Sequence, residues 1–212
     1  MHFVAEDNRQ PGFVHVLLIT TGSVASIKAP LIVKALLAVR SMLGSPEPIL
    51  TCAFFQYQNV RVEVVATKPS LAFYSRTDIS DAGSRVWTDE DEWIRLGITK
   101  YVQEGFKIGD PILHIELRRW ADIVLVAPCS ANSLSKIAHG TCDNLATSLM
   151  RALSPTTPTY IFPAMNTLMY DHPLTAEHLR IVRDVVRYNV VGPIGKTLAC
   201  GDTGVWFFFA RA

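Results

Sequence analysis

The chain has 212 residues, of which 49% are hydrophobic and 18% charged, and its formal net charge is +1. This composition is typical of a folded globular protein, because disordered chains have fewer apolar residues and a larger net charge. The length suits one α/β domain, which we assign to residues 1–212. The near-neutral charge predicts no nucleic-acid partner, so any phosphate must be bound locally.

The N-terminal sequence MHFVAEDNRQPG has acidic and polar residues where a signal peptide would have a basic start and an apolar run. We expect residues 1–12 to be disordered and the protein to be cytosolic. The sequence contains no apolar stretch of 18 residues, so no membrane partner is predicted. The four cysteines lie far apart without a CxxC pair, and we expect free thiols and no metal site at Cys52, Cys129, Cys142 and Cys200.

Apolar runs of strand length alternate with segments of helical spacing. Strands are predicted at FVHVLLIT, RVEVVAT and IVLVA, which are residues 13–20, 61–67 and 123–127, and a short strand over 160–162 stops at Pro163. Helices are expected over residues 23–40, 134–138, 144–153 and 175–188. This alternation predicts a doubly wound parallel sheet of the α/β class, which binds its ligands at the carboxyl ends of the strands.

Two long segments do not follow this alternation. Residues 41–59 contain Gly44, Pro46 and Pro48, and we interpret them as an insertion in the first crossover. Residues 76–110 are polar and charged, and are expected to form surface loops and short helices.

Small polar residues follow the first and third predicted strands. The turn at 21–23 offers backbone N–H groups and hydroxyls that could hold a phosphate at a helix N-terminus, although a tight turn capped by Ser23 explains it equally well. The loop at 130–133 has the same two interpretations. Two phosphate-competent loops in one sheet favour a mononucleotide ligand.

Three further residues could carry chemistry. His114, in LHIELRRWAD, could act as a base at physiological pH, although a structural or surface histidine is the more common case. Asn166, in PAMNTLMYDHP, could bind a carboxylate through its amide, but the residues alone favour a turn in which Met165 and Met169 fill the core. Cys200, in LACGDTG, could donate a proton or remain an inert thiol.

Five motifs share their order and spacing with a known family. TGSVASIK, HIELRRWAD, APCSANSLSKIAHGTCDNL, PAMNTLMYDHP and LACGDTG resemble the flavin-containing cysteine decarboxylases, which include phosphopantothenoylcysteine decarboxylases and the halotolerance-type flavoproteins of plants and fungi. The likeness runs from about Phe13 to Gly204. Five motifs in one order are far more specific than any one of them.

The resemblance implies a flavodoxin-like, Rossmann-type fold and a homotrimer that holds FMN at its subunit interfaces. It implies that His114 is the catalytic base and that Cys200 is a late proton donor. The substrate-binding residues implied are Asn166, Met169, Thr197 and Ala199. The FMN contacts implied are Gly22, Ser23, Val24, Thr67, Lys68, Phe73, Ser130, Ala131, Asn132, Ser133 and Ala164.

The implied reaction converts 4′-phosphopantothenoylcysteine to 4′-phosphopantetheine in coenzyme A biosynthesis. Loss of CO₂ from a cysteine carboxylate would leave an unstabilised carbanion, and prior oxidation by the flavin supplies the electron sink. Two alternatives stay open: a phosphatase-inhibitory subunit of the halotolerance type, and a decarboxylase of peptide C-terminal cysteines. The regulatory relatives tend to carry long acidic extensions, which this sequence lacks.

The end of the chain departs from the family pattern. Residues 205–212 read VWFFFARA, where relatives continue into a further stretch that ends in a helix. We regard this end as atypical. A truncated gene product and an aromatic segment that packs on a neighbouring subunit both remain interpretations.

Overall fold

A computed structural model describes residues 3–38, 59–93, 108–192, 194–197 and 203–206. Its main feature is a six-stranded sheet with the order β3-β2-β1-β4-β5-β7, in which all neighbouring strands run parallel. The predicted doubly wound parallel sheet is therefore confirmed. The strands are β1 Val14–Thr20, β2 Val60–Ala66, β3 Arg85–Trp87, β4 Ile123–Cys129, β5 Thr159–Pro163 and β7 Asn189–Val190.

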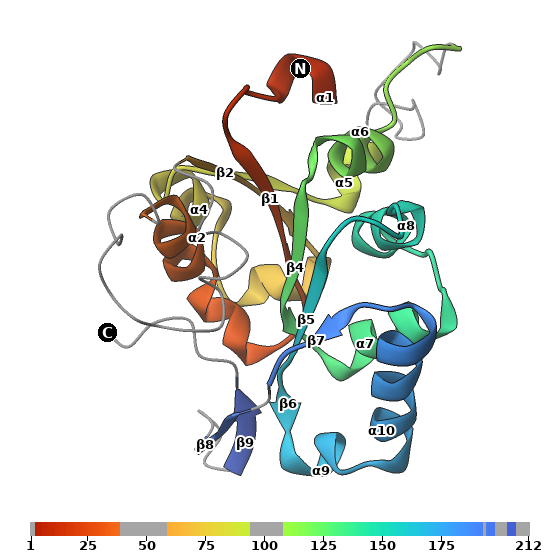
Figure 1. The fold of residues 1–212 in the computed structure, drawn as a ribbon. Helices are drawn as coiled ribbons and strands as arrows, with labels where there is room; N and C mark the ends of the chain where they lie inside the picture. Colours follow the sequence, from red (N-terminus) through yellow and green to blue (C-terminus); the bar gives the residue numbers. More distant parts are fainter. Residues whose placement is uncertain (1–2, 39–58, 94–107, 193, 198–202, 207–212) are drawn as a thin grey trace.

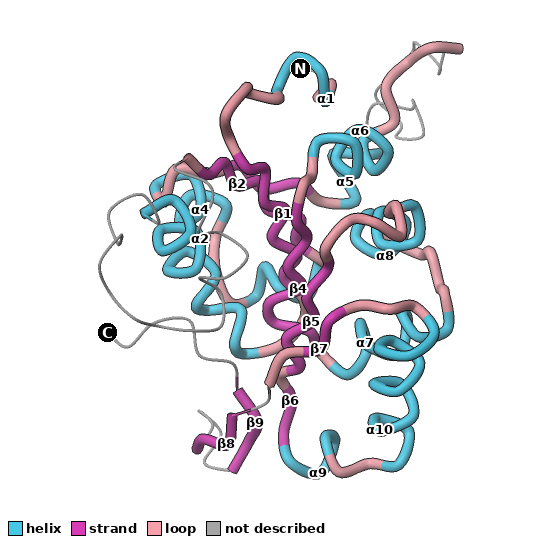
Figure 2. Tube along the Cα trace, in the orientation of Figure 1, coloured by secondary structure: helices cyan, strands magenta, loops and turns pink. Residues whose placement is uncertain are grey.

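Helices connect the strands and cover both faces of the sheet (Figures 1 and 2). In Figure 1, α2 and α4 lie on one side, and α5, α6, α7, α8 and α10 lie on the other. The helical segments are α1 Ala5–Asn8, η1 Val24–Lys28, α2 Ala29–Leu37, η3 Lys68–Ala72, α4 Arg76–Asp81, α5 Asp89–Trp93, α6 Leu113–Trp120, α7 Ala131–His139, α8 Leu145–Ala152, α9 Thr167–Tyr170, α10 Pro173–Arg180 and η4 Ile181–Val185.

The side chains of β1 alternate between two apolar cores. Val16 and Leu18 belong to the cluster that contains Ile32 of α2, whereas Leu17 and Ile19 belong to the cluster on the other face. All seven residues of β1 are buried. A strand that is buried on both faces reads as a continuous apolar run, which explains why this strand could be predicted from its sequence.

Several predicted boundaries change in the structure. Segment 24–28 forms a 3₁₀ turn before α2, with Pro30 in the first turn of that helix, where a missing N–H costs no hydrogen bond. The helix predicted over 175–188 begins at Pro173 and continues after Arg180 as a π-helical turn. Within 76–110, the short strand β3 was not expected, because three residues are too few to show a periodicity.

A second, three-stranded sheet lies beside the carboxyl end of the first (Figure 1). It is antiparallel, with the order β6-β9-β8, where β6 is Met165–Asn166, β8 is Ile194–Thr197 and β9 is Thr203–Trp206. The insertion predicted over 41–59 falls outside the described residues except for Asn59. Residues 207–212 of the atypical chain end also fall outside them.

The expectation of a disordered segment 1–12 is wrong for residues 3–12. Phe3 is only 2% exposed and packs edge-to-face against Trp87 and Trp120, with ring centroids 5.2 and 6.1 Å away. The backbone N–H of Ala5 donates to the buried Glu116 carboxylate at 2.8 Å. The burial of one large aromatic side chain against two tryptophans anchors this polar segment. The composition of the segment alone did not reveal this anchor.

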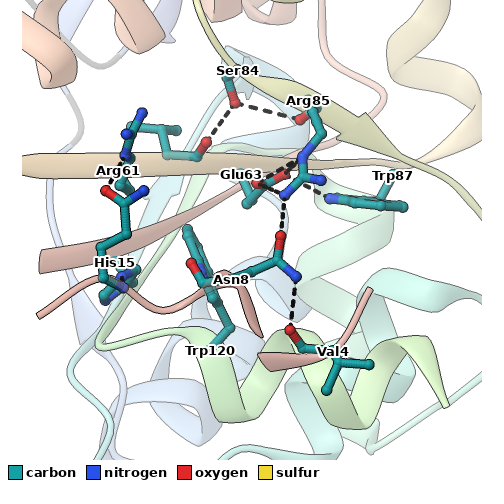
Figure 3. Close-up of polar contacts among 11 residues, drawn as sticks. Val4, Asn8, His15, Arg61, Glu63, Ser84, Arg85, Trp87 and Trp120 are labelled. Carbon is teal, nitrogen blue, oxygen red and sulfur yellow. Dashed lines mark hydrogen bonds and ion pairs between the residues drawn. The ribbon is translucent and has the colours of Figure 1, made fainter. Parts of the chain in front are cut away.

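Buried charge completes this end of the molecule (Figure 3). The carboxylate of Glu63 accepts hydrogen bonds from Arg85 at 2.6 Å and from the indole N–H of Trp87 at 2.8 Å. The same guanidinium lies over the rings of Phe3 and Trp87 and donates to the side-chain oxygen of Asn8. Each charged group therefore has a partner, as burial requires.

His15 also ties the N-terminal segment to the sheet. Its side chain is 1% exposed, its Nδ1 lies 2.8 Å from an Asp122 carboxylate oxygen, and its Nε2 accepts the backbone N–H of Gln10 at 3.0 Å. Nε2 can accept this bond only while the ring is neutral. Burial lowers the pKa of His15, an effect reinforced by the charges of Arg9 and Arg61 and opposed by Asp122.

The lowered pKa predicts a pH-dependent stability. The unfolded chain takes up a proton near pH 6.5, whereas the folded protein resists protonation. The contribution of His15 is therefore fully present above about pH 6.5 and is lost as the pH falls through the folded-state pKa. Urea unfolding of wild type and His15→Gln between pH 7.5 and about 5 measures it. We expect a smaller loss of unfolding free energy in the variant, and equal losses would contradict this role.

Candidate functional site

The polar site lies where the loops after β1 and β4 meet. These two strands are neighbours in the sheet, and the chain order reverses between them, so the following loops leave in opposite directions. The buried hydroxyl of Thr21 donates to the carbonyl oxygen of Pro128 at 2.8 Å and accepts the backbone N–H of Ser130 at 2.8 Å. One side chain therefore holds the two phosphate-competent loops together.

The loop after β4 leads directly into α7. Ser130 is the N-cap, and its hydroxyl oxygen accepts the backbone N–H of Ser133 at 3.3 Å, which confirms the predicted capping. The first N–H groups of a helix have no acceptor within it, so those of Ala131 and Asn132 point outward with the positive end of the helix dipole. This helix start is suited to bind an anion.

The turn after β1 contains a glycine with a steric requirement. A Cβ atom added at Gly22 would lie 2.7 Å from the Cβ of Pro69, closer than such atoms approach in proteins. Ser23 caps η1, since its hydroxyl accepts the N–H of Ala25. The two predicted interpretations, a capped turn and a phosphate-binding loop, are thus compatible. The hydroxyl of Ser23 caps η1, and Gly22, which has no side chain, leaves the backbone N–H groups of the turn accessible to a ligand.

The loop after β2 closes the other side of the site. Thr20 at the end of β1 bonds the hydroxyls of Ser70 and Tyr74, at 3.1 and 2.6 Å. Burial raises the pKa of Tyr74. The hydroxyl of Thr67 is buried and has no hydrogen-bond partner among the described residues. Buried hydroxyls are normally paired, so this one is available to bond a ligand atom.

The sequence predicted that the four cysteines are free thiols and that the chain has no metal site. Cys129 at the end of β4 is fully buried, and burial raises the pKa of its thiol to about 12, which makes it a poor nucleophile. Cys142 is a free thiol on the surface. Cys52 and Cys200 lie outside the described residues. Within the described part of the chain, no three His, Cys, Asp or Glu side chains gather as metal ligands.

Beyond β5, the chain forms a turn that carries Asn166. Its side-chain oxygen accepts the backbone N–H of Met169 at 2.8 Å and so caps α9. The amide NH₂ group has no acceptor among the described residues, and it remains able to donate to a carboxylate. Met169 is 48% exposed, so it does not fill the core as the alternative interpretation required; Met165 does, at 8%.

The strand pairing brings the LACGDTG motif close to this turn. In the second sheet, Asn166 of β6 lies opposite Gly204 of β9, and Thr197 of β8 lies opposite Thr203. Ala199 and Cys200, in the connection between β8 and β9, lie outside the described residues. Ala164 is buried between the two sheets, where its N–H donates to the carbonyl oxygen of Cys129.

His114 lies on α6, apart from this turn. Its ring nitrogen Nδ1 pairs with a carboxylate oxygen of Glu92 on α5. Figure 1 shows α5 and α6 toward the end of the sheet where β1 begins, whereas β6 and α9 lie beyond the other end. The structure therefore gathers the predicted loops at 22–24, 67–73 and 130–133, but one chain does not bring His114 next to Asn166.

Comparison with known proteins agrees with this architecture. The family model described as Flavoprotein matches residues 4–206. The chain belongs to the Flavoprotein family. It is 42% identical over 199 residues to the phosphopantothenoylcysteine decarboxylase of Arabidopsis thaliana, covering 94% of this chain and 80% of that protein.

Another relative is much longer than this chain. A Schizosaccharomyces pombe protein named a probable thymidylate synthase is 42% identical over 192 residues, which are 90% of this chain and only 26% of that protein. The chain therefore spans about a quarter of this curated relative. The activity in its name belongs to the whole protein.

Two solved structures share the fold. A mutant PPC decarboxylase complexed with pantothenoylaminoethenethiol is 40% identical, with a TM-score of 0.71 and coverage of 91% of this chain and 89% of that one. The FMN binding protein AtHal3 is also 40% identical, with a TM-score of 0.68 and coverage of 91% and 88%.

Two residues of the site were not among the sequence candidates. Thr21 was seen only as part of a turn, and its bond to Ser130 joins residues 109 positions apart. Glu92 belongs to the acidic run DEDE, which is ordinarily a solvated helix face, and no local signal distinguishes it from its neighbours.

Thr21→Val tests the bridge between the two loops. Valine has nearly the same shape but leaves the N–H of Ser130 and the carbonyl of Pro128 unpaired in a buried place. We expect a loss of roughly 2 kcal/mol in the free energy of unfolding, measured in urea. Thr21→Ser keeps the hydroxyl and should remain closer to wild type. Equal stability of both variants would show that the bridge contributes nothing.

Proposed function

We propose that the chain is an FMN-dependent phosphopantothenoylcysteine decarboxylase, which converts 4′-phosphopantothenoylcysteine to 4′-phosphopantetheine in coenzyme A biosynthesis. The observation that carries the proposal is the anion cradle at the junction of β1 and β4, where Thr21 holds the loops 22–24 and 130–133 together. The names of the Arabidopsis relative and of the structure that binds pantothenoylaminoethenethiol support the substrate.

The residues of the cradle fit FMN, and the FMN binding protein AtHal3 supports this cofactor. Gly22, Ser23 and Val24, together with Ser130 to Ser133 at the start of α7, would hold its phosphate. The unpaired hydroxyl of Thr67 would bond the flavin, with Lys68, Phe73 and Ala164 beside it. When bound, FMN supplies the oxidation that makes the cysteine carboxylate able to lose CO₂.

The chain's own side chains then bind the substrate and move protons. Asn166, whose oxygen is held by the N–H of Met169, would donate its amide N–H to the substrate carboxylate. Met169, Thr197 and Ala199 would line the substrate. His114 would take the substrate's thiol proton, and Cys200 would supply the last proton to the product.

The separation of His114 from Asn166 favours a site shared between subunits, and we propose a homotrimer. A second copy would supply His114 to the turn that carries Asn166. Apolar side chains exposed on η1, α2, α9 and α10 would be covered in such an assembly. They are Val24, Ile27, Leu31, Leu168, Met169 and Leu174.

The small-molecule partner, 4′-phosphopantothenoylcysteine, follows from the same proposal. No helix in the described residues is long and apolar enough to cross a bilayer. The cytosolic location and the absence of a nucleic-acid partner stay predictions.

Anaerobic incubation of the purified protein with 4′-phosphopantothenoylcysteine tests the reaction, with CO₂ and product mass as readouts. Wild type should release CO₂ and form saturated 4′-phosphopantetheine. Cys200→Ser should still release CO₂ but accumulate the unsaturated enethiol, which has two hydrogen atoms fewer, because the final proton is missing. Cys142→Ser, at an exposed cysteine, is the matched control.

Other results would redirect the proposal. Release of CO₂ from cysteine-ended peptides alone would identify a peptidyl-cysteine decarboxylase. Absence of bound flavin and of CO₂ would contradict the enzyme and favour a regulatory subunit.

A mixing experiment tests the shared site. His114→Ala and Asn166→Ala should each lower kcat by at least about 100-fold, as loss of an acid–base or orienting group does. Unfolding and refolding the two variants together should restore part of the activity, because some sites then combine intact residues from two chains. No recovery at any mixing ratio, with assembly verified by light scattering, would place both residues in one subunit's site.

A further inference from the structure

The geometry points to Glu92 as the positioning residue of His114, which it holds with Nδ1 protonated so that Nε2 is the basic nitrogen. This inference rests on the proposed function, because it assigns the protonated atom of the proposed base. Glu92 lies on α5 and His114 near the start of α6, and the contact joins Nδ1 to Oε1 of the carboxylate.

Burial makes this contact strong and directional. The side chain of Glu92 is 2% exposed and that of His114 is 25% exposed, so the carboxylate is buried while part of the His114 side chain is accessible. Its second oxygen, Oε2, is buried without a hydrogen-bond partner among the described residues. A buried carboxylate without partners is energetically costly, so the contact with the His114 ring is important for the stability of Glu92 in this position.

Neighbouring contacts fix the position of α5. Asp91 accepts hydrogen bonds from the backbone N–H of Thr88 at 2.8 Å and from Arg76 at 3.0 Å. Asp89 accepts the backbone N–H of Leu145 at the start of α8 at 2.7 Å. Three of the four acids in DEDE thus have assigned partners, and Glu90 is exposed. The contacts of Asp89 and Asp91 hold α5 in place, and Glu92 on the same helix thereby lies against α6.

The chemical consequence concerns one proton. A carboxylate can only accept, so the ring must donate Nδ1–H to it, and the lone pair of a neutral ring is then on Nε2. In the proposed reaction the substrate's S–H bond breaks, its proton forms an N–H bond at Nε2, and sulfur keeps the electron pair. The charge of Glu92 stabilises the imidazolium that results.

Nitrogen NMR of the full-length, flavin-loaded protein labelled at histidine measures the tautomer directly. His114→Gln identifies the signals of the ring. At a pH where the ring is neutral, wild type should show Nδ1 protonated and Nε2 unprotonated. Glu92→Leu should lose this preference, whereas Glu92→Gln should keep it, because the amide oxygen can still accept the Nδ1–H.

We expect the variants to rank in kcat as they do in the tautomer of His114. Glu92→Leu should lower kcat by on the order of 10- to 100-fold while KM changes little, because the substrate is still bound but its proton lacks an aligned acceptor. Glu92→Gln should recover part of that loss. Glu90→Gln, on the exposed face of the same helix, should behave as wild type.

Asp91→Asn separates positioning from packing, since it weakens the anchoring of α5 without removing the carboxylate at His114. A loss of kcat equal to that of Glu92→Leu, or a wild-type tautomer in Glu92→Leu, would overturn the inference. The tautomer needs no substrate. A tautomer that follows Glu92 in a protein that releases no CO₂ would therefore support the positioning role while the proposed reaction fails.

Discussion

The site depends on the buried hydroxyl of Thr21. It joins the ends of β1 and β4 through Pro128 and Ser130, so two turns far apart in the sequence present their N–H groups to one volume. Anion binding by backbone N–H groups requires several donors at fixed positions, and each would otherwise have to be ordered at an entropic cost when the ligand binds. A side chain that can donate and accept at once is suited to this junction, which explains why threonine rather than an apolar residue follows the strand.

Buried polar groups lie toward both ends of the sheet, and most of those described above have partners. At the end where β1 begins, the carboxylates of Glu63 and Glu116 and the ring of His15 all have partners, and Phe3 closes the layer. At the carboxyl end, the hydroxyl of Thr67 lacks a partner within the described residues. On the side of α5, Oε2 of Glu92 also lacks a partner within the described residues. Unpaired buried groups reduce stability. Thr67 lies beside the loops proposed to hold FMN, and Glu92 contacts the proposed base His114.

Two residues with roles in the proposed reaction lie far apart in one chain, which is a second constraint on the site. Asn166 caps α9 beside the second sheet, while His114 lies on α6 and contacts Glu92. Within one chain these groups belong to different ends of the molecule, so the proposed active site would have to be completed by another copy. In the proposed trimer, activity would depend on assembly, and the exposed apolar side chains of η1 and α9 would be covered.

The sequence by itself determined the four main strands, the class of the sheet and the loops 22–24 and 130–133, because strand length, alternation of elements and capping residues are local properties. It also led to the family through five motifs. Only the tertiary structure decided that residues 3–12 are ordered, that Thr21 bonds Ser130, and that one acid of DEDE contacts His114. Each of these features depends on contacts between residues that are far apart in the sequence. A short stretch of sequence therefore cannot predict them.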